Sequence, residues 1–273
     1  MKTQIDYNGK IFTSEENIFK SSNRGFRFGD AIFETIFVDT DSIRLYDYHW
    51  DRLKSGCEEL EFLIPEAWNQ KYFQDKIAYL LKINALSSAR VRLTVFRGDS
   101  SFGEADLPAE YLIEIFPLEN YNTRGINLGL YTAIRKSPGI LSNYKTANYL
   151  LNVLAKLYAS KNEFDDCLYL NDDGRICESS ISNVFWIEKG KIYTPPLTEG
   201  PVAGVMRRHL IKELEYSENP VIEKELHVEK LYDAEEIFLT NAIRGIIPVK
   251  SFSGNIYKTA VTNSLMLELG FSK

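Results

Sequence analysis

Three charged residues stand where apolar segments begin or end, and each could take part in catalysis. Lys145 precedes an apolar helical pattern, and a lysine turned inward from such a boundary loses hydration, which favours the neutral amine that forms Schiff bases. Glu178 ends a strand-like segment before small polar residues, where a carboxylate needs a partner such as a protonated ring nitrogen. Arg52 lies near a helix start and could bind a phosphate through two hydrogen bonds. Taken singly, such residues are more often hydrated surface groups, so only their combination is informative.

The segment PVAGVMRR, residues 201–208, offers a second phosphate-binding element. The first N–H groups of a helix lack partners within the helix and carry partial positive charge, so they attract anions. Gly204 has no side chain and would let a ligand approach the backbone closely. Any helix start shares these properties, so the segment gains meaning only beside the three charged residues.

Composition excludes several classes of protein. The 273 residues are 44% hydrophobic and 26% charged, as in globular proteins, so extended disorder is excluded. Acidic residues outnumber basic ones by 38 to 32, the net charge is −6 and no lysine or arginine run occurs, so we expect no nucleic-acid partner. No apolar run reaches membrane-spanning length and the N-terminal residues contain no signal-peptide core, so we expect a soluble cytoplasmic protein with no membrane partner.

Common metal and nucleotide motifs are missing from the sequence. The three cysteines and three histidines form no CxxC pair, HExxH motif or cysteine–histidine cluster, so we expect no metal site. GxSxG, GxGxxG and GxxxxGK[ST] are also absent, and with them the signatures of serine hydrolases, dinucleotide sites and Walker-type sites.

Two sets of strand and helix patterns must position these residues. In residues 31–38 the alternation places Phe33 on one face of a strand and Glu34 on the other, and Asp47 is the expected N-cap of the helix that follows. In the first part of the chain, strands are predicted over 31–38, 89–98 and 111–118, and helices over 47–61 and 66–84.

A polar, irregular stretch at 119–125 predicts a linker between two α+β domains, residues 1–118 and 126–273. The second domain carries apolar strands separated by Asp-Asp-Gly and Glu-Lys-Gly turns. Its predicted elements are a strand over 126–135, a helix over 146–160, a strand meander over 165–196, a helix over 201–214, two strands within 236–249 and a helix over 258–269.

The order of six sequence blocks resembles that of the class IV, fold-type IV pyridoxal-phosphate enzymes. The blocks are RGFRFGDAIFET (24–35), YHWDRL (48–53), YKTANYL (144–150), ESSISNVFW (178–186), YTPPLTEGPVAGVMRR (193–208) and FLTNAIRGIIPV (238–249). The six blocks cover nearly the whole chain in register with those of the family, and a match of this extent is too great to arise by chance. The resemblance implies the two-domain α+β fold of these enzymes, pyridoxal 5′-phosphate as cofactor, and a homodimer whose site lies between the domains and receives a loop from the other subunit.

The resemblance assigns a role to each of the three charged residues. Lys145 would form the Schiff base with the cofactor aldehyde and then move the substrate α-proton. Glu178 would pair with the pyridine nitrogen and keep it protonated, so that the ring withdraws electrons. Arg52 would bind the phosphate.

The resemblance also implies further cofactor contacts. Tyr149 falls in an Asn-Tyr step like the one that supplies a phenol in the branched-chain enzymes, but it comes one residue sooner after the lysine. Asn183 would hold the cofactor loop, and the backbone of two segments would help to bind the phosphate. These segments contain Val205, Met206, Thr240, Asn241 and Ala242.

Substrate-facing positions distinguish the members of the family. The D-amino-acid enzymes have an Arg-x-His after the RG turn and a tyrosine in the first strand, whereas this chain has RGDSSFGEADLP and Phe33. TNAIRGIIPV and the short spacing from Lys145 to Asn148 are similar to the 4-amino-4-deoxychorismate lyases. Arg92 lies where branched-chain aminotransferases carry an arginine, although some lyases share it. We therefore expect such a lyase, which releases pyruvate and 4-aminobenzoate for folate synthesis.

The small-molecule substrate of this lyase carries two carboxylates, which arginines could anchor beside Phe33. Arg92, Arg27 and Arg244 are the candidates by charge and position. The alternatives are an aminotransferase acting on branched-chain or other apolar amino acids with 2-oxoglutarate, a D-amino-acid aminotransferase, and a cofactor-binding protein without catalysis. The presence of Lys145 together with Arg52 and Glu178 argues against the last.

Overall fold

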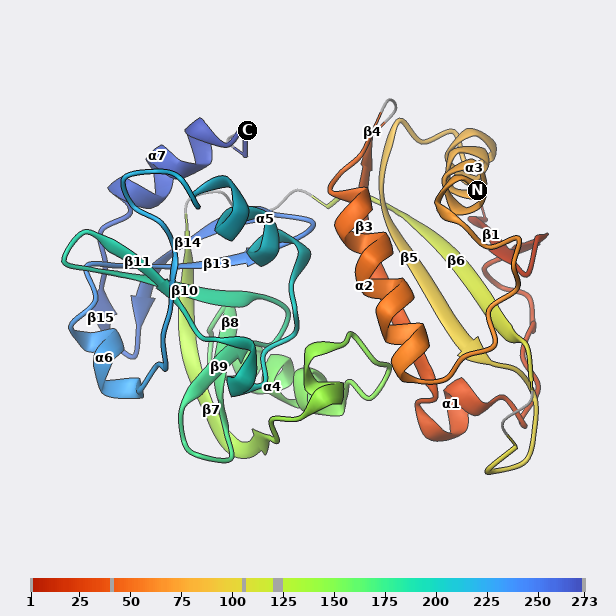
Figure 1. Ribbon diagram of the computed structural model, residues 1–273, viewed down its shortest axis with the longest axis horizontal. Coiled ribbons are helices and arrows are strands. Elements are labelled where there is room, and N and C mark those ends of the chain that lie inside the picture. Colours follow the sequence, from red (N-terminus) through yellow and green to blue (C-terminus); the bar gives the residue numbers. More distant parts are fainter. Residues whose placement is uncertain (1, 40–41, 105–106, 120–124, 272–273) are drawn as a thin grey trace. The chain divides into compact units, whose positions relative to one another are not determined.

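The computed structural model describes residues 2–39, 42–104, 107–119 and 125–271 of the chain. Contacts divide it into two compact units (Figure 1). Unit 1 comprises Met1–Glu119 and Tyr144–Asn148, and unit 2 comprises Asn120–Asn143 and Tyr149–Lys273. The segment that contains Lys145 thus belongs with the first unit, whereas the sequence-based division at 126 assigns it to the second. Most of the linker expected at 119–125 lies outside the described residues.

In the described residues, unit 1 contains a six-stranded antiparallel sheet in the order β2-β1-β6-β5-β3-β4. Its strands are β1 (Gln4–Tyr7), β2 (Lys10–Thr13), β3 (Ala31–Asp39), β4 (Ser42–Ile43), β5 (Ser88–Arg97) and β6 (Ala109–Pro117), and its helices are α1 (Arg24–Phe28), α2 (Tyr46–Glu59) and α3 (Gln70–Ile83). The three strands and two helices predicted for this region are confirmed.

One face of this sheet packs against α2 and α3 (Figure 1). Alternation in β3 turns Ile32 and Ile36 to this face, where they join Leu53 of α2 and Ile77 of α3 in one buried cluster. Full burial of each such side chain stabilises the fold by roughly 1.5–3 kcal/mol. The opposite face carries the other residues of β3, among them Phe33, and is the face on which several cations lie.

Unit 2 contains, among the described residues, a nine-stranded sheet in the order β12-β11-β10-β13-β14-β7-β8-β9, with β15 beside β14. Its strands are β7 (Ile126–Lys136), β8 (Asp166–Asn171), β9 (Ile176–Ser179), β10 (Asn183–Glu188), β11 (Lys191–Thr194), β12 (Ile222–Glu223), β13 (Glu236–Asn241), β14 (Gly245–Phe252) and β15 (Asn255–Ile256). Its helical elements are η1 (Ile140–Asn143), α4 (Leu150–Lys161), η2 (Leu197–Glu199), α5 (Val205–Glu213), α6 (Val228–Tyr232) and α7 (Ala260–Glu268).

Several helix starts differ from the sequence-based expectation, among them those of α2, α4 and α5. The N-cap of α2 is Leu45, in a left-handed conformation with φ of 53°, and Asp47 lies within the first turn instead. Helix α4 begins at Leu150 rather than 146, because the preceding residues pair with a strand. Helix α5 begins at Val205 rather than 201, because Gly204 is extended with φ of −64° and ψ of 134°.

Candidate functional site

The segment around Lys145 is held against the start of β3. The N–H of Phe33 donates to the carbonyl of Lys145 at 2.9 Å, and the N–H of Ala147 donates to the carbonyl of Ala31 at 2.8 Å. Thr146 forms an antiparallel bridge with the strand between these two bonds. These two backbone hydrogen bonds, one on each side of Thr146, therefore fix the position of the Lys145 main chain in unit 1.

The Lys145 side chain lies over an aromatic ring on the cation-bearing face of the sheet. Its Nζ is 4.2 Å from the centroid of the Phe33 ring, and the guanidinium carbon of Arg92 is 3.7 Å from the same centroid. Each contact places a cation against the electron-rich face of a phenyl ring. Unit 1 thus brings together Lys145, Phe33 and Arg92, whose roles as amine and substrate contacts stay predictions.

Arg52 is held by a buried carboxylate that projects from β3 toward α2. Its Nε donates to Glu34 Oε1 at 2.8 Å and its Nη2 donates to Oε2 at 2.5 Å, a two-point ion pair. The Nδ1 atom of His49 lies 2.6 Å from Glu34 Oε2. Because Arg52 and His49 are three residues apart on α2, both side chains reach the same carboxylate.

Charges within this cluster determine its protonation. Burial alone would raise the pKa of Glu34, but the Arg52 guanidinium and the hydrogen bonds lower it to about 2. Burial lowers the pKa of His49, and the charges of Arg52 and Lys145 lower it further against the opposing effect of Glu34. The imidazole is therefore neutral, and because an ionised carboxylate only accepts, the proton is on Nδ1. Nε2 is buried without a hydrogen-bond partner among the described residues.

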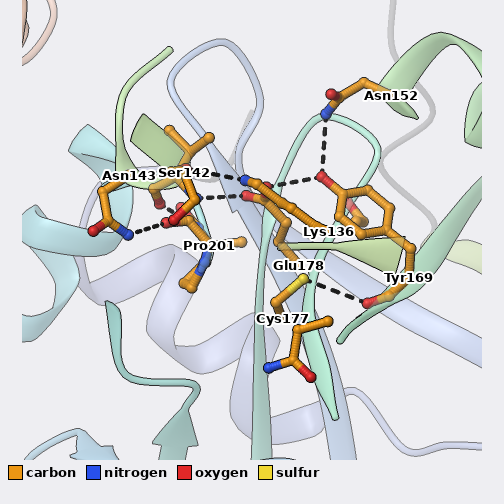
Figure 2. A network of polar contacts seen from close by, with 12 residues as sticks. Lys136, Ser142, Asn143, Asn152, Tyr169, Cys177, Glu178 and Pro201 are labelled. Atoms are coloured by element: carbon orange, nitrogen blue, oxygen red, sulfur yellow. Dashed lines mark hydrogen bonds and ion pairs between the residues drawn. The ribbon is translucent and has the colours of Figure 1, made fainter. Parts of the chain in front are cut away.

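In unit 2, Glu178 lies at the centre of a hydrogen-bond network (Figure 2). Its side chain is nearly fully buried. Oε1 accepts from Lys136 Nζ and from the Tyr169 hydroxyl at 2.8 Å, and Oε2 accepts from the backbone N–H of Val202 at 2.9 Å. An ion-pair partner and two further donors thus compensate the burial of this carboxylate.

Tyr169 and its neighbours form the second layer of this network. Burial, and then the negative charge of Glu178, raises the pKa of Tyr169 well above its ordinary value, so the phenol donates as a neutral group. Asn152 of α4 donates to the Tyr169 hydroxyl at 3.2 Å and to the carbonyl of Ser180 at 2.8 Å. The thiol of Cys177 donates to the Tyr169 carbonyl (Figure 2).

The N-terminus of α5 lies beside the ends of β10 and β13. Asn183 begins β10, pairs in register with Thr240 of β13 and donates from Nδ2 to the carbonyl of Val202 at 2.8 Å. A Cβ atom at Gly204 would stand 1.8 Å from Asn183 Oδ1, so any other residue here would require Asn183 to move. Among the described hydrogen bonds, no side chain caps this helix. The N–H groups of its first turn, which contains Val205 and Met206, are therefore left without a capping side chain.

The loop after β13 is shaped by its own asparagine. Asn241 Oδ1 accepts from the backbone N–H groups of Ile243 at 3.1 Å and Arg244 at 2.8 Å, while Nδ2 donates to the hydroxyl of Ser182 at 2.9 Å. Ala242 lies at the tip of this turn and is partly exposed. The Asn241 side chain thus builds the turn, which assigns it a positioning task in the phosphate region that the sequence predicts.

Two further predicted residues are Tyr149 in unit 2 and Arg27 in unit 1. Tyr149 is the residue before α4. Its electrostatic interaction adds to the rise in the pKa of Tyr169, so the two phenols lie near each other. Arg27 is exposed at the end of α1, with its guanidinium carbon 5.2 Å from the centroid of the Phe28 ring.

The residues in these clusters have the chemistry that pyridoxal 5′-phosphate requires. Thr240 Oγ1 is buried and has no hydrogen-bond partner among the described residues, which leaves a donor for a phosphate oxygen. The N–H groups at the start of α5 in unit 2 and the Arg52 guanidinium in unit 1 are each suited to bind an anion. Lys145 supplies an amine for an aldehyde, and Glu178 supplies an anionic acceptor for a ring N–H. The donor set therefore fits the cofactor that the resemblance implies.

Several residues of these clusters are not predicted by the sequence analysis. Glu34 does leave a signal, because it is a charged residue between Ile32 and Ile36 on the apolar face of an alternating strand. Lys136 and Tyr169 leave none, because they lie 42 and 9 residues from Glu178 and resemble ordinary strand residues.

The described residues contain no membrane-spanning or metal-binding candidate. None of the described helices combines the length and the apolar composition needed to cross a bilayer. Nor do three or more histidine, cysteine, aspartate or glutamate side chains among those residues converge as they would around a metal ion.

Comparison with known proteins shows where the chain has relatives. The model of the amino-transferase class IV family matches residues 31–252. The chain is 28% identical over 250 residues to aminodeoxychorismate lyase of Bacillus subtilis, covering 89% of this chain and 85% of the relative. It is 26% identical over 272 residues to the branched-chain-amino-acid aminotransferase of Escherichia coli, covering 92% and 85%. The crystal structure of an Escherichia coli branched-chain amino acid aminotransferase has a TM-score of 0.89 at 24% identity, over 99% of this chain and 94% of that chain, which shows the fold.

Proposed function

Because the chain belongs to the class IV aminotransferase family, whose enzymes depend on pyridoxal 5′-phosphate, we propose that Lys145, Arg52 and Glu178 bind this cofactor. Further contacts would come from Thr240, from the first turn of α5 and from the turn that Asn241 builds. The unpartnered Thr240 hydroxyl and the uncapped helix support a phosphate subsite in unit 2. The Glu34 ion pair supports Arg52 as a rigid cationic contribution from unit 1.

When bound, the cofactor supplies an aldehyde that captures amines and a ring that withdraws electrons from the substrate α-carbon. Lys145 provides the amine for attachment, and its Nζ then takes and returns the proton. The hydrogen bond from Phe33 to the Lys145 carbonyl holds the main chain while the side chain moves. Glu178 accepts the ring N–H and thereby keeps that nitrogen protonated.

Among the activities of this family, we propose the cleavage of 4-amino-4-deoxychorismate into pyruvate and 4-aminobenzoate. The supporting observation is the face of the unit 1 sheet opposite α2 and α3, which we call the arginine face after Arg44, Arg90 and Arg92. Each guanidinium carbon lies over a phenyl ring: Arg92 is 3.7 Å from the Phe33 centroid, Arg90 is 4.6 Å from that of Phe116 and Arg44 is 3.8 Å from that of Phe37.

An unsaturated six-membered ring with two carboxylates matches such a surface. Guanidinium groups bind carboxylates through paired hydrogen bonds, and phenyl rings contact other rings by stacking or by their edges. Glu114 is the acidic residue in register with Arg92, and burial raises its pKa although Arg92 and Arg90 oppose the rise. Arg92 Nε lies 3.9 Å from Glu114 Oε2, so this carboxylate partly compensates the charge of the arginine face. Arg27 and Arg244 remain further candidate anchors.

An aminotransferase acting on branched-chain or other apolar amino acids with 2-oxoglutarate is the second candidate. Arg92 supports it equally, because a single arginine can bind the side-chain carboxylate of glutamate, the product of that reaction. The relatives are divided in the same way between lyase and aminotransferase. The shared cofactor chemistry does not separate the two activities.

A pair of assays on one preparation distinguishes the two activities. The protein is incubated with enzymatically produced 4-amino-4-deoxychorismate, and in parallel with leucine or D-alanine and 2-oxoglutarate. Release of pyruvate together with 4-aminobenzoate, lost in Lys145→Ala, is the expected result. Glutamate formed from leucine without any lyase product would contradict the lyase assignment and support the aminotransferase.

We further propose that the enzyme acts as a homodimer in the cytoplasm. Leu150, Val153 and Leu157 recur at helical spacing along α4 with 69%, 48% and 51% of their surface exposed, which is an apolar stripe that a second subunit could cover. The cysteines Cys57, Cys167 and Cys177 are all buried and free, as expected in a reducing compartment.

A further inference from the structure

Lys136 has a position that neither the sequence patterns nor the proposed function assigns. It ends β7, its side chain is mostly buried, and its ammonium group contacts both Glu178 Oε1 and the carbonyl of Ser142, the latter at 3.1 Å (Figure 2). Lysine is seldom buried without a task, because its charge must be compensated. Here one anion and one carbonyl compensate it.

The hydrogen bonds to Glu178 can be counted by atom. An ionised carboxylate has about two acceptor positions on each oxygen. Oε1 receives both Lys136 and Tyr169, whereas Oε2 receives, among the described residues, only the N–H of Val202. The remaining acceptor position is therefore on Oε2, and the two donors on Oε1 fix the orientation of the carboxylate.

The same lysine connects Glu178 to the chain that leads to Lys145. Ser142, whose carbonyl accepts from Lys136, belongs to η1, which ends two residues before Lys145. Next to it, Asn143 donates from Nδ2 to the carbonyl of Pro201 at 2.7 Å and accepts from the N–H of Ala203 at 2.8 Å. The backbone N–H of Val202, which lies between Pro201 and Ala203, donates to Glu178. The contacts close into a ring that joins β7, η1, the segment before α5 and the end of β9.

Lys136 is the charged donor to Glu178, and the other two donors are neutral. Burial, and then the Glu178 charge, raises the pKa of Tyr169, so its phenol contributes a dipole only. The Val202 N–H is likewise a dipole. Without the ammonium group, the buried Glu178 carboxylate would keep only dipolar donors and would lose its ion-pair partner.

We propose that Lys136 is a positioning residue whose ion pair with Oε1 holds the Glu178 carboxylate with Oε2 turned to accept from the cofactor's ring nitrogen. This inference rests on the proposed role of Glu178. It predicts that the tighter binding of a cofactor with a ring N–H, compared with an analogue that lacks the ring nitrogen, depends on Lys136. A merely structural lysine would instead affect all ligands alike.

The test compares two ligands across matched variants. Dissociation constants are measured by quenching of protein fluorescence for pyridoxal 5′-phosphate and for its analogue in which CH replaces the ring nitrogen. We expect the wild type to prefer the natural cofactor by about tenfold, the size of one well-placed charged hydrogen bond. Lys136→Met should reduce the preference to about twofold or less, and Lys136→Arg, which keeps the charge, should retain most of it.

Arg135→Met is the matched control, because it removes a positive charge one residue away. Arg135 donates to the carbonyl of Asp172 on the surface, so this variant should keep the tenfold preference. Lys136→Gln, which keeps a donor but not the charge, gives a second test of the same expectation if the methionine variant fails to fold by circular dichroism.

The outcomes separate this inference from the function on which it rests. A wild type without preference for the ring nitrogen would overturn the role of Glu178 itself. If the wild type shows the preference and both uncharged Lys136 variants keep it, or lose affinity for both ligands equally, the role of Lys136 is refuted.

Discussion

At the scale of single residues, two buried carboxylates, Glu34 and Glu178, are stabilised by different cations. Glu34 accepts two hydrogen bonds from Arg52 and one from His49, all from one helix. Glu178 accepts from a lysine, a phenol and a main-chain N–H that come from three separate elements. The first arrangement follows from helical spacing in YHWDRL, whereas the second depends on the tertiary fold.

Replacing Glu34 by glutamine should destabilise unit 1 at neutral pH. The amide keeps the volume but leaves the buried Arg52 guanidinium without its anion, which costs about 3 kcal/mol in the free energy of unfolding. Urea denaturation at pH 7 measures this change. Glu59→Gln, an exposed carboxylate at the end of α2, the helix that carries Arg52, is the control and should change the value by less than about 0.5 kcal/mol.

Acid should remove the difference between the wild type and Glu34→Gln. The folded-state pKa of Glu34 is lowered from 4.5 to about 2, so the ion pair contributes its full stability above the unfolded-state value. That contribution is lost as the pH falls from about 4.5 toward 2. A difference in stability that stays constant over this range would show that the charge of Glu34 does not stabilise the fold.

At the scale of elements, the helices and strands were accessible from sequence, but the helix starts were not. Alternation over 31–38 and helical spacing over 47–61 predict β3 and α2 closely, because local periodicity reflects burial on one face. The predicted start at 146 fails because residues 145–147 pair with β3, more than a hundred residues earlier. No local pattern encodes such a bridge, and it is this bridge that positions Lys145.

The candidate site shows the same division between local and tertiary information. Lys145, Glu178 and Arg52 were found because each belongs to a block that resembles a known family. Lys136 was not found, because its contact with Glu178 spans 42 residues and its own segment reads as the end of an ordinary strand.

Gly204→Ala tests the role of the α5 N-terminus. The backbone there is compatible with alanine, but the new Cβ would lie 1.8 Å from Asn183 Oδ1, so Asn183 must move and its bond to Val202 is lost. We expect cofactor affinity to fall about tenfold and stability to fall by roughly 1–3 kcal/mol, as for other overpacked sites. Fluorescence titration and thermal unfolding measure the two effects.

Gly139→Ala provides the matched control for that substitution. A Cβ at Gly139 meets no atom within 4 Å, so affinity and stability should stay close to the wild type. Unchanged cofactor affinity in Gly204→Ala would contradict a phosphate subsite at this helix.

At the scale of the whole molecule, the proposed dimer gives a separate prediction. Leu157→Glu places a charge on the apolar stripe of α4 and should convert the dimer to monomers in light scattering coupled to size exclusion, because an unpaired buried charge opposes association. Leu267→Glu, on an exposed position of α7, should leave the dimer intact. A monomeric wild type, or a Leu157→Glu protein that remains dimeric, would refute the α4 interface.

The most direct test of the central claim is to identify the residue that carries the cofactor. The protein is incubated with pyridoxal 5′-phosphate, reduced with borohydride, digested and analysed by mass spectrometry. We expect the phosphopyridoxyl group on Lys145, and no modified peptide from the Lys145→Ala protein. Modification of a different lysine in the wild type, or of none, would contradict the assignment of Lys145 and with it the proposed enzyme chemistry.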